Sequence, residues 1–189
     1  MVRTQGIGEE IMTETNSNNE EGRPREQFVV YLSGTMDEDK VEHREWRRKA
    51  TKLLGEHGII TRSPYRGRDK SKIVKMDNYH YIVTDAPVNN RLSNMLVARD
   101  LKDVQDCDML LVNLRETKGG RPSIGTISEL AWAYEHHKPV VCVVDKETSD
   151  SHYYKHPFVH QFISQWVSNV EDGVSVIVNY WHPQANEGA

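Results

Sequence analysis

The chain has 189 residues, of which 37% are hydrophobic and 28% charged, and its formal net charge at pH 7 is -4. These proportions fit one globular domain, and the acidic balance gives no electrostatic reason to expect a nucleic-acid polymer as partner. No apolar run approaches the ~20 residues that span a bilayer, and the first residues lack a signal-peptide core. Cys107 and Cys142 are expected as small core residues in a reducing compartment. We therefore expect a cytoplasmic protein without a membrane partner.

The two ends of the chain differ from its middle in composition. Residues 1–26 are mostly Gly, Glu, Asn, Thr and Ser, and a segment with so few large apolar side chains cannot offset its ordering entropy. We predict a flexible acidic tail over 1–26, one domain over 27–181, and a frayed C-terminus over 182–189.

The first strand is predicted at 28–32, a short apolar run that ends in the turn formers Ser33, Gly34 and Thr35. If this strand lies in a parallel sheet, the turn at its carboxyl end lies where ligands bind. The turn is therefore expected to form one wall of a binding crevice.

A helix is predicted over about 41–57, with Asp37 and Asp39 as cap candidates and Gly58 as its stop. A brief second strand is expected at 59–61. The helix should bury one apolar face, because large side chains recur at helical spacing; they are Trp46, Ala50, Leu53 and Leu54.

The segment 65–90 is longer than an ordinary connection and rich in charge, aromatic rings and turn formers. Long connections in compact domains are often lids or binding loops. Tyr79 and Tyr81 would then stack on a flat ring, and Arg66 or Arg68 would hold an anion. An exposed surface excursion with ordinary charges is the alternative.

Helical periodicity resumes over 94–105, and this helix contains Asp100. Lys102 and Asp103 are expected to face solvent, whereas the direction of Asp100 is left open because the pattern does not fix it. The apolar positions of the predicted helix are Met95, Leu96, Val97, Leu101 and Val104.

A βαβ unit is predicted between the apolar runs 109–114 and 139–144. The helix between them begins near Ser123, a good cap, and Gly125 lets a ligand approach the backbone. Glu129 lies about one turn into this helix, so its carboxylate is expected to point into the crevice. The alternative is a solvated Glu129 that complements the helix dipole.

The C-terminal part contains three histidines at spacing four, which on one helix can bind a metal. Pro157 interrupts such a helix, and no Cys or acidic residue has ligand spacing, so no metal site is expected; the histidines are His152, His156 and His160. A fifth strand is predicted at 174–178. It follows an amphipathic helix that contains Phe158, Phe162, Trp166 and Val170.

Five short strands that alternate with helices predict an α/β fold with a doubly wound parallel sheet in the order 2-1-3-4-5. The first and third strands are then neighbours, and the crevice at the switch point lies at their carboxyl ends. Neither GxGxxG after the first strand nor GxxxxGK[ST] occurs, so neither a dinucleotide fingerprint nor a P-loop is indicated.

The residues expected in this crevice favour carboxylate chemistry. The expected crevice contains Glu129, Asp100 and the phenol of Tyr31, with no thiol nucleophile and no Ser-His-Asp order. Two carboxyl groups can cleave a glycosidic bond when one attacks the anomeric carbon and the other donates a proton to the leaving group. This chemistry is a retaining route through a covalent sugar ester.

Four stretches in this order, 31–35, 100–108, 125–129 and 138–140, resemble the nucleoside 2-deoxyribosyltransferase family. The resemblance covers most of the chain from Phe28 to about Val144. It implies a flavodoxin-like, Rossmann-like fold and a small nucleoside or nucleotide as substrate. No cofactor is implied.

The resemblance also implies roles for single residues. Glu129 would be the nucleophile, Asp100 would exchange a proton with the base, and Tyr31 would lie near the nucleophile. A homo-oligomer is implied, because members of this family complete their sites from a neighbouring subunit. The residues expected to bind substrate are Ser33, Gly34, Thr35, Asn113, Ser123, Gly125, Thr126 and Arg66.

Two chemistries compete within the family. Deoxyribosyltransferases typically have Asp where this chain has Ser123, and Pro where it has Thr35, whereas the nucleoside 5'-monophosphate N-glycosidases are closer at both positions. Hydroxyl and backbone N–H groups at a helix start suit a phosphate, which Asp would repel. The acidic run 36–39, where the hydrolases tend to place Arg, is a departure, so Arg121, Arg66, Arg68 or Arg91 would have to supply positive charge.

The chain is therefore predicted to cleave an N-glycosidic bond, with hydrolysis favoured over transfer to a second base. Two alternatives from other classes stay open. One is a module that binds nucleotides in the same crevice without chemistry, and the other is a flavodoxin-like cofactor binder, which would be yellow with flavin.

Overall fold

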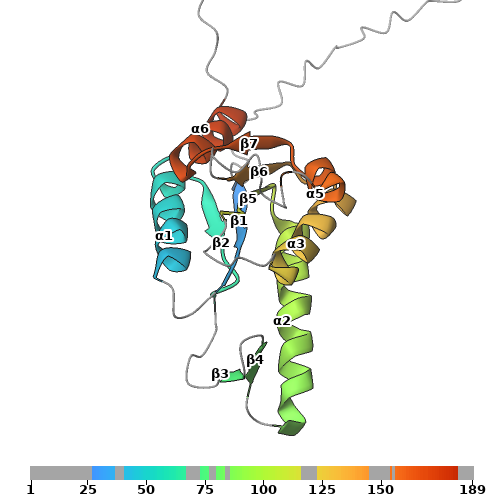
Figure 1. Ribbon diagram of the computed structural model, residues 1–189. Helices are drawn as coiled ribbons and strands as arrows, with labels where there is room; N and C mark the ends of the chain where they lie inside the picture. The colour runs from blue at the N-terminus through green and yellow to red at the C-terminus, as the bar shows by residue number, and fades with distance from the viewer. Residues whose placement is uncertain are drawn as a thin grey trace, which may run out of the picture.

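The computed structural model describes residues 27–36, 41–66, 73–76, 80–83, 86–115, 123–144, 154 and 156–182 (Figure 1). The predicted tail at 1–26 lies outside these ranges. The elements in chain order are β1 (Val29–Gly34), α1 (Glu42–Gly55), β2 (Ile60–Arg62), β3 (Ile73–Met76), β4 (His80–Val83), α2 (Ala86–Asp106), β5 (Met109–Asn113), α3 (Ile124–Glu135), β6 (Val140–Val143), α5 (Pro157–Phe162), β7 (Gln165–Val167) and α6 (Val170–Trp181).

Five strands form one sheet in the order β2-β1-β5-β6-β7, and every neighbouring pair is parallel. This order confirms the predicted doubly wound topology. Helices α1 and α6 cover one face of the sheet, and α2, α3 and α5 cover the other (Figure 1). Gly34 at the end of β1 is paired in register with Asn113 at the end of β5. The carboxyl ends of these two strands thus form the switch point at which such folds bind ligands.

The core consists of two layers, one on each face of the sheet. Val30 and Leu32 pack with α1 and α6, whereas Tyr31 between them packs with α2 and α3. This alternation follows from the two-residue period of a strand. Tyr31 is completely buried, so its phenol is held at the base of the α2 and α3 layer.

Helix α1 agrees with the prediction in its apolar face but not in its caps. Trp46, Ala50 and Leu54 are buried, and Leu53 packs against them. The N-cap position is Val41, which makes no side-chain cap hydrogen bond. Asp37 and Asp39, the predicted caps, lie outside the described residues.

The C-terminal elements are the clearest correction. Trp166, predicted in a helix, lies in strand β7 and is paired with Cys142, whereas the segment predicted as the fifth strand belongs to helix α6. Asn169 caps α6 by accepting a 2.7 Å hydrogen bond from Asp172 N. Val174 and Ile177 are buried on the helical face that this cap sets. The Asn169 cap and packing on the sheet therefore outweigh the strand preference of the β-branched residues in this segment.

Helix α2 begins at Ala86, eight residues before the predicted start at 94. Strands β3 and β4 pair antiparallel in the preceding connection and lie beside the N-terminal part of α2, away from the main sheet (Figure 1). Met95 and Val97 were predicted as apolar-face residues, yet they are 67% and 55% exposed. Both come earlier in α2 than Val104, which is buried.

Of the ligand contacts predicted in the connection 65–90, Tyr79 and Arg68 lie outside the described residues. Tyr81 lies in β4. Across the described ranges, the structure contains no helix that combines the length and apolar character needed to cross a membrane.

Candidate active site

Glu129 lies one turn into α3 and is 6% exposed. The helix begins as predicted, because Ser123 Oγ accepts a 3.3 Å hydrogen bond from Thr126 N. The alternative interpretation, in which a solvated Glu129 only complements the helix dipole, is therefore wrong. A carboxylate this deeply buried needs hydrogen-bond partners, and β1 supplies them.

Two hydroxyl groups of β1 donate to the two carboxylate oxygens of Glu129. Tyr31 Oη donates to Oε1 at 2.8 Å, and Ser33 Oγ donates to Oε2. Tyr31 and Ser33 are two residues apart on a strand, so their side chains lie on the same face of the sheet. The first strand thereby fixes both oxygens of a carboxylate that lies 98 residues later in the chain.

The surroundings of Glu129 shift its ionisation in both directions. Burial raises the pKa of Glu129 to about 7, and the negative charge of Asp100 also raises it. The hydrogen bonds from Ser33 and Tyr31 and the positive charge of Arg47 oppose this rise. Burial, with the charge of Glu129, raises the pKa of Tyr31 far above its usual range. Tyr31 therefore stays a protonated donor, while Glu129 changes charge near neutral pH.

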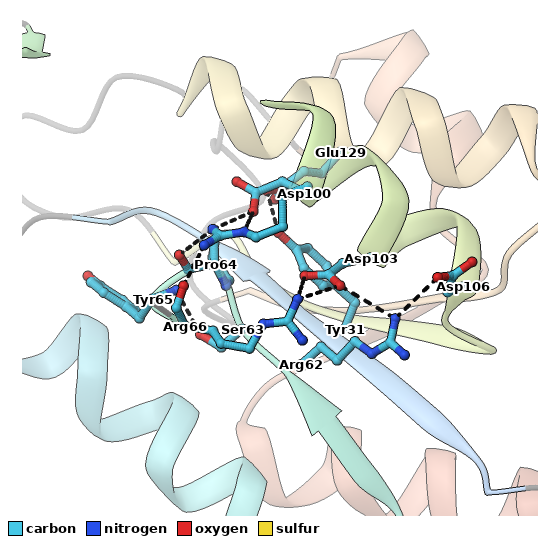
Figure 2. A network of polar contacts seen from close by, with 11 residues as sticks. Tyr31, Arg62, Ser63, Pro64, Tyr65, Arg66, Asp100, Asp103, Asp106 and Glu129 are labelled. Atoms are coloured by element: carbon cyan, nitrogen blue, oxygen red, sulfur yellow. Dashed lines mark hydrogen bonds and ion pairs between the residues drawn. The ribbon is translucent and has the colours of Figure 1, made fainter. Parts of the chain in front are cut away.

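Asp100 is directed inward from α2, which settles the orientation that the sequence left open. It is 8% exposed and lies close enough to Glu129 and Tyr31 to affect the ionisation of both. Asp100 and Glu129 come from the neighbouring helices α2 and α3 (Figure 2). Arg99 donates to Asp100 Oδ1 from Nε at 3.1 Å and from Nη2 at 2.7 Å. Two carboxyl groups from different helices thus share one buried region.

Asp103 was expected in solvent, yet it is 3% exposed. Arg66 Nη2 donates to its two oxygens at 2.8 and 2.7 Å, and Arg62 Nη1 donates to Oδ1 at 3.4 Å (Figure 2). Asp103 is buried because the segment after β2 covers it. Lys102 is exposed as predicted. Arg66, predicted to bind substrate, is thus joined to Asp103 by its described hydrogen bonds.

Arg47 is a structural residue of the site that the sequence did not indicate. It is 4% exposed and donates to four backbone carbonyl groups. Those of Gly34 and His43 are reached at 2.8 and 2.6 Å, and those of Leu32 and Thr35 at 3.3 Å. The available signal was its place beside Trp46 on the buried face of α1. Arg47 fixes the turn after β1 and brings a positive charge toward Glu129.

Gly34 occupies a backbone position that favours glycine. Its φ is +156°, and a Cβ added there would lie 2.9 Å from the carbonyl oxygen of Asn113. The close approach of β1 and β5 at their carboxyl ends therefore depends on the missing side chain. Asn113 is half-buried, and its Oδ1 accepts a 3.0 Å hydrogen bond from Arg115 N.

The first turn of α3 contains the other predicted binding residues. Gly125 is exposed, and an added Cβ would meet only Ser123 Oγ, at 3.9 Å. Thr126 is 1% exposed, and its Oγ1 has no hydrogen-bond partner among the described residues. Thr35 is half-buried at the opposite side of the switch point, where its carbonyl accepts from Arg47. The predicted binding residues therefore lie in two places, the turn after β1 and the first turn of α3. Strand β1 holds the Glu129 carboxylate, and α3 contains Glu129 itself.

The cysteines do not supply a reactive nucleophile, and the described histidines do not form a metal site. Cys107 and Cys142 are free and buried, and burial raises the pKa of the Cys107 thiol to about 12 and that of Cys142 above its usual range. Such thiols are poor nucleophiles at neutral pH. Among the residues that the structure describes, no three His, Cys, Asp or Glu side chains are grouped to hold a metal ion.

Comparison with known proteins identifies the class to which this fold and site belong. The family model of Nucleoside 2-deoxyribosyltransferase matches residues 30–164. This chain belongs to the nucleoside 2-deoxyribosyltransferase family, and it is an enzyme of the glycosyl-transferring or glycosidase kind. A comparison with curated proteins found no match.

Three solved structures show the shared fold. A conserved protein from Enterococcus faecalis V583 has a TM-score of 0.55 at 16% identity, covering 82% of this chain and 99% of its own. The 2-deoxyribosyltransferase from Bacillus psychrosaccharolyticus has a TM-score of 0.51 at 15% identity, with coverage of 76% and 88%. A molybdenum cofactor binding protein from Rippkaea orientalis has a TM-score of 0.50 at 12% identity, with coverage of 84% and 99%. Proteins of different kinds share this architecture, so function depends on the residues of the site.

Proposed function

We propose that this chain cleaves the N-glycosidic bond of a nucleoside 5'-monophosphate or nucleoside, ribose or 2'-deoxyribose, through a covalent glycosyl ester on Glu129. Water is the proposed acceptor of the sugar. The observation that carries this proposal is the buried Glu129 carboxylate, held by Tyr31 and Ser33 and accompanied by Asp100. A paired nucleophile and proton donor is the arrangement that retaining glycoside cleavage needs.

The proposed reaction has two steps. In the reacting state Glu129 is ionised and Asp100 carries a proton. A Glu129 oxygen forms a bond to the anomeric carbon, the C–N bond to the base breaks, and the base leaves with the bonding pair and the proton of Asp100. Water then adds to the anomeric carbon and gives a proton to Asp100, while the ester bond breaks and restores the Glu129 carboxylate. Tyr31 stays protonated throughout and orients the carboxylate.

The preference for a 5'-phosphate rests on the groups around the switch point. Ser123 Oγ accepts the cap hydrogen bond, and a serine hydroxyl is a group that can also donate to a phosphate oxygen. Backbone N–H groups at the start of α3 and the Thr35 hydroxyl are the other proposed donors. Since Arg66 is paired with Asp103, the proposal assigns the phosphate to these uncharged donors.

Transfer of deoxyribose to a second base is the alternative, and the family to which the chain belongs favours it. The same glycosyl ester on Glu129 serves both reactions, which differ in whether water or a base attacks it.

We further propose that the protein is a homo-oligomer in the cytoplasm. The family resemblance supports the oligomer, and the composition supports the compartment. Light scattering during gel filtration tests the oligomer.

The first test is chromatography of purified protein incubated with deoxynucleosides, ribonucleosides and their 5'-monophosphates, each with and without a second free base. Free base from the monophosphates supports hydrolysis with phosphate recognition. A new nucleoside that forms only with the second base supports transfer instead. Tight binding without base release over hours supports the non-catalytic alternative.

Glu129→Gln tests the nucleophile, and Glu135→Gln is a matched control because Glu135 is exposed at the other end of α3. We expect the first variant to lose turnover and the second to keep it. Mass spectrometry of acid-quenched enzyme should detect a sugar on a peptide that contains Glu129. Full turnover by Glu129→Gln would remove Glu129 from its proposed role.

A further inference from the structure

We propose that Arg99 is a positioning residue that holds the Asp100 carboxyl group in place for proton exchange with the departing base. This inference rests on the proposed function, because it concerns the proton step at the same site. Arg99 and Asp100 are consecutive on α2, where neighbouring side chains point about 100° apart. Their contact therefore requires the Arg99 side chain to bend around the helix toward Asp100.

The contact between the two side chains is a double one. Arg99 Nε and Nη2 both donate to the same oxygen, Asp100 Oδ1, at 3.1 and 2.7 Å. Two donors of a planar guanidinium fix an acceptor more narrowly than one donor does. This arrangement restricts rotation of the carboxyl group and determines where its other oxygen lies.

Arg99 is itself fixed by the segment that follows β2. Its Nη2 also donates to the carbonyl of Pro64 at 2.9 Å, and its Nη1 donates to the carbonyl of Arg66. The Arg99 side chain is 24% exposed and that of Asp100 is 12% exposed. The guanidinium thus bridges the backbone of residues 64–66 and the carboxyl group of Asp100.

A second contact holds the same segment against α2. The Arg66 side chain donates to both oxygens of Asp103, one helical turn after Arg99. Because the carbonyl groups that receive Arg99 belong to a segment fixed in this way, the position of Asp100 depends on residues 64–66. A lysine at position 99 cannot reproduce this bridge, since one ammonium group lacks the planar set of donors.

The test is a double-mutant cycle of Arg99→Gln and Asp100→Asn, with kcat and KM measured for the best substrate of the panel. We expect Arg99→Gln to lower kcat by about tenfold to 100-fold, because a small displacement of a catalytic group has an effect of this size. KM should change by less than about threefold. Arg99→Lys should recover part of kcat at most.

The cycle separates positioning from general support of the fold. In the Asp100→Asn background, measured over long incubations at high enzyme concentration, Arg99→Gln should lower kcat by less than about twofold. Arg62→Gln is the matched control, because Arg62 contacts Asp103 and Asp106 but makes no described contact with Asp100. It should leave kcat within about twofold.

Two results would overturn the inference, and they have different consequences for the proposed function. If Arg99→Gln or Arg99→Lys lowers kcat by the same factor with Asn at position 100, Arg99 acts independently of Asp100. In that case the proposed function stands and the positioning role is wrong. If the wild-type enzyme releases no base from any substrate, the proposed function fails and the positioning role fails with it.

Discussion

Tyr31 and Glu129, 98 residues apart in the chain, share a 2.8 Å hydrogen bond in which the phenol donates to the carboxylate. Both groups are buried, and burial acts on them in the same direction by disfavouring the charged form. For Tyr31 this guarantees a proton to donate. For Glu129 it means that the charged form, which the proposed reaction needs, becomes abundant only near neutral pH.

The pH dependence of turnover should report Glu129. We expect kcat/KM to rise with pH on the acid side, with an apparent pKa of about 7, because only the carboxylate attacks the anomeric carbon. Initial rates between pH 5 and pH 9 measure this limb. An acid limb with a midpoint near 4.5 would mean that the buried environment of Glu129 is absent in the active enzyme.

Ser33→Ala should move that acid limb to higher pH. The hydrogen bond from Ser33 is the largest influence that lowers the pKa of Glu129, so its loss should shift the midpoint upward by about one pH unit. The loss of rate should therefore be larger at pH 6 than at pH 9. Ser128→Ala is the control, since Ser128 Oγ donates to the Ile124 carbonyl on the same helix. An equal loss at all pH values would indicate lost geometry without a change in ionisation.

The sequence was sufficient for much of this site because its local signals were strong. Ser123 is a good cap followed by a regular helix, so the depth of Glu129 in α3 could be predicted from spacing alone. The side that Tyr31 and Ser33 share follows from the alternation of side chains along β1. What the sequence could not show was the inward direction of Asp100, because it lies among charged neighbours and its burial depends on Arg99 and on the segment after β2.

The fold was predicted for a partly wrong reason. The fifth strand was placed at 174–178 because β-branched residues favour strands, yet these residues form part of α6 and the fifth strand is β7. The spacing of Val170, Val174 and Ile177 also fits a helical face, and the Asn169 cap selects that solution. The strand order was still predicted correctly, because β7 takes the place of the strand expected at 174–178 and the sheet keeps five strands. Arg47 and Asp103 were missed because the burial of a charge depends on tertiary contacts.

Glu129→Gln should change the pH dependence of stability in a defined direction. The folded-state pKa of Glu129 lies above its unfolded value of 4.5, at about 7, so folding favours the protonated form. Wild-type stability should then fall by ~3 kcal/mol as pH rises between these values. The neutral amide of the Glu129→Gln variant removes this loss. Urea unfolding at pH 4.5 and pH 8 measures the free energy of unfolding of both proteins. Relative to the wild type, the variant should be more stable at pH 8 than at pH 4.5. The same difference at both pH values would contradict the shifted pKa.

Gly34→Ala should destabilise the protein by ~1–3 kcal/mol, because the new Cβ meets the Asn113 carbonyl oxygen and φ at this position is +156°. Separation of the carboxyl ends of β1 and β5 should lower turnover as well. Gly55→Ala is the control, since nothing lies within 4 Å of a Cβ added there. Urea unfolding compares the two variants, and equal stability would show that β1 and β5 can move apart without cost.

Gly125→Ala separates substrate approach from folding at the start of α3. An added Cβ meets only Ser123 Oγ at 3.9 Å, and alanine in a helix is favoured over glycine by roughly 0.5–1 kcal/mol. Thermal stability should therefore be equal or higher. If the phosphate lies against this backbone as proposed, KM for the monophosphate should rise about tenfold or more, while KM for the unphosphorylated nucleoside changes less. A variant that is more stable and has the same KM for both substrates would place the phosphate away from α3, and the preference argued from Ser123 would then be wrong.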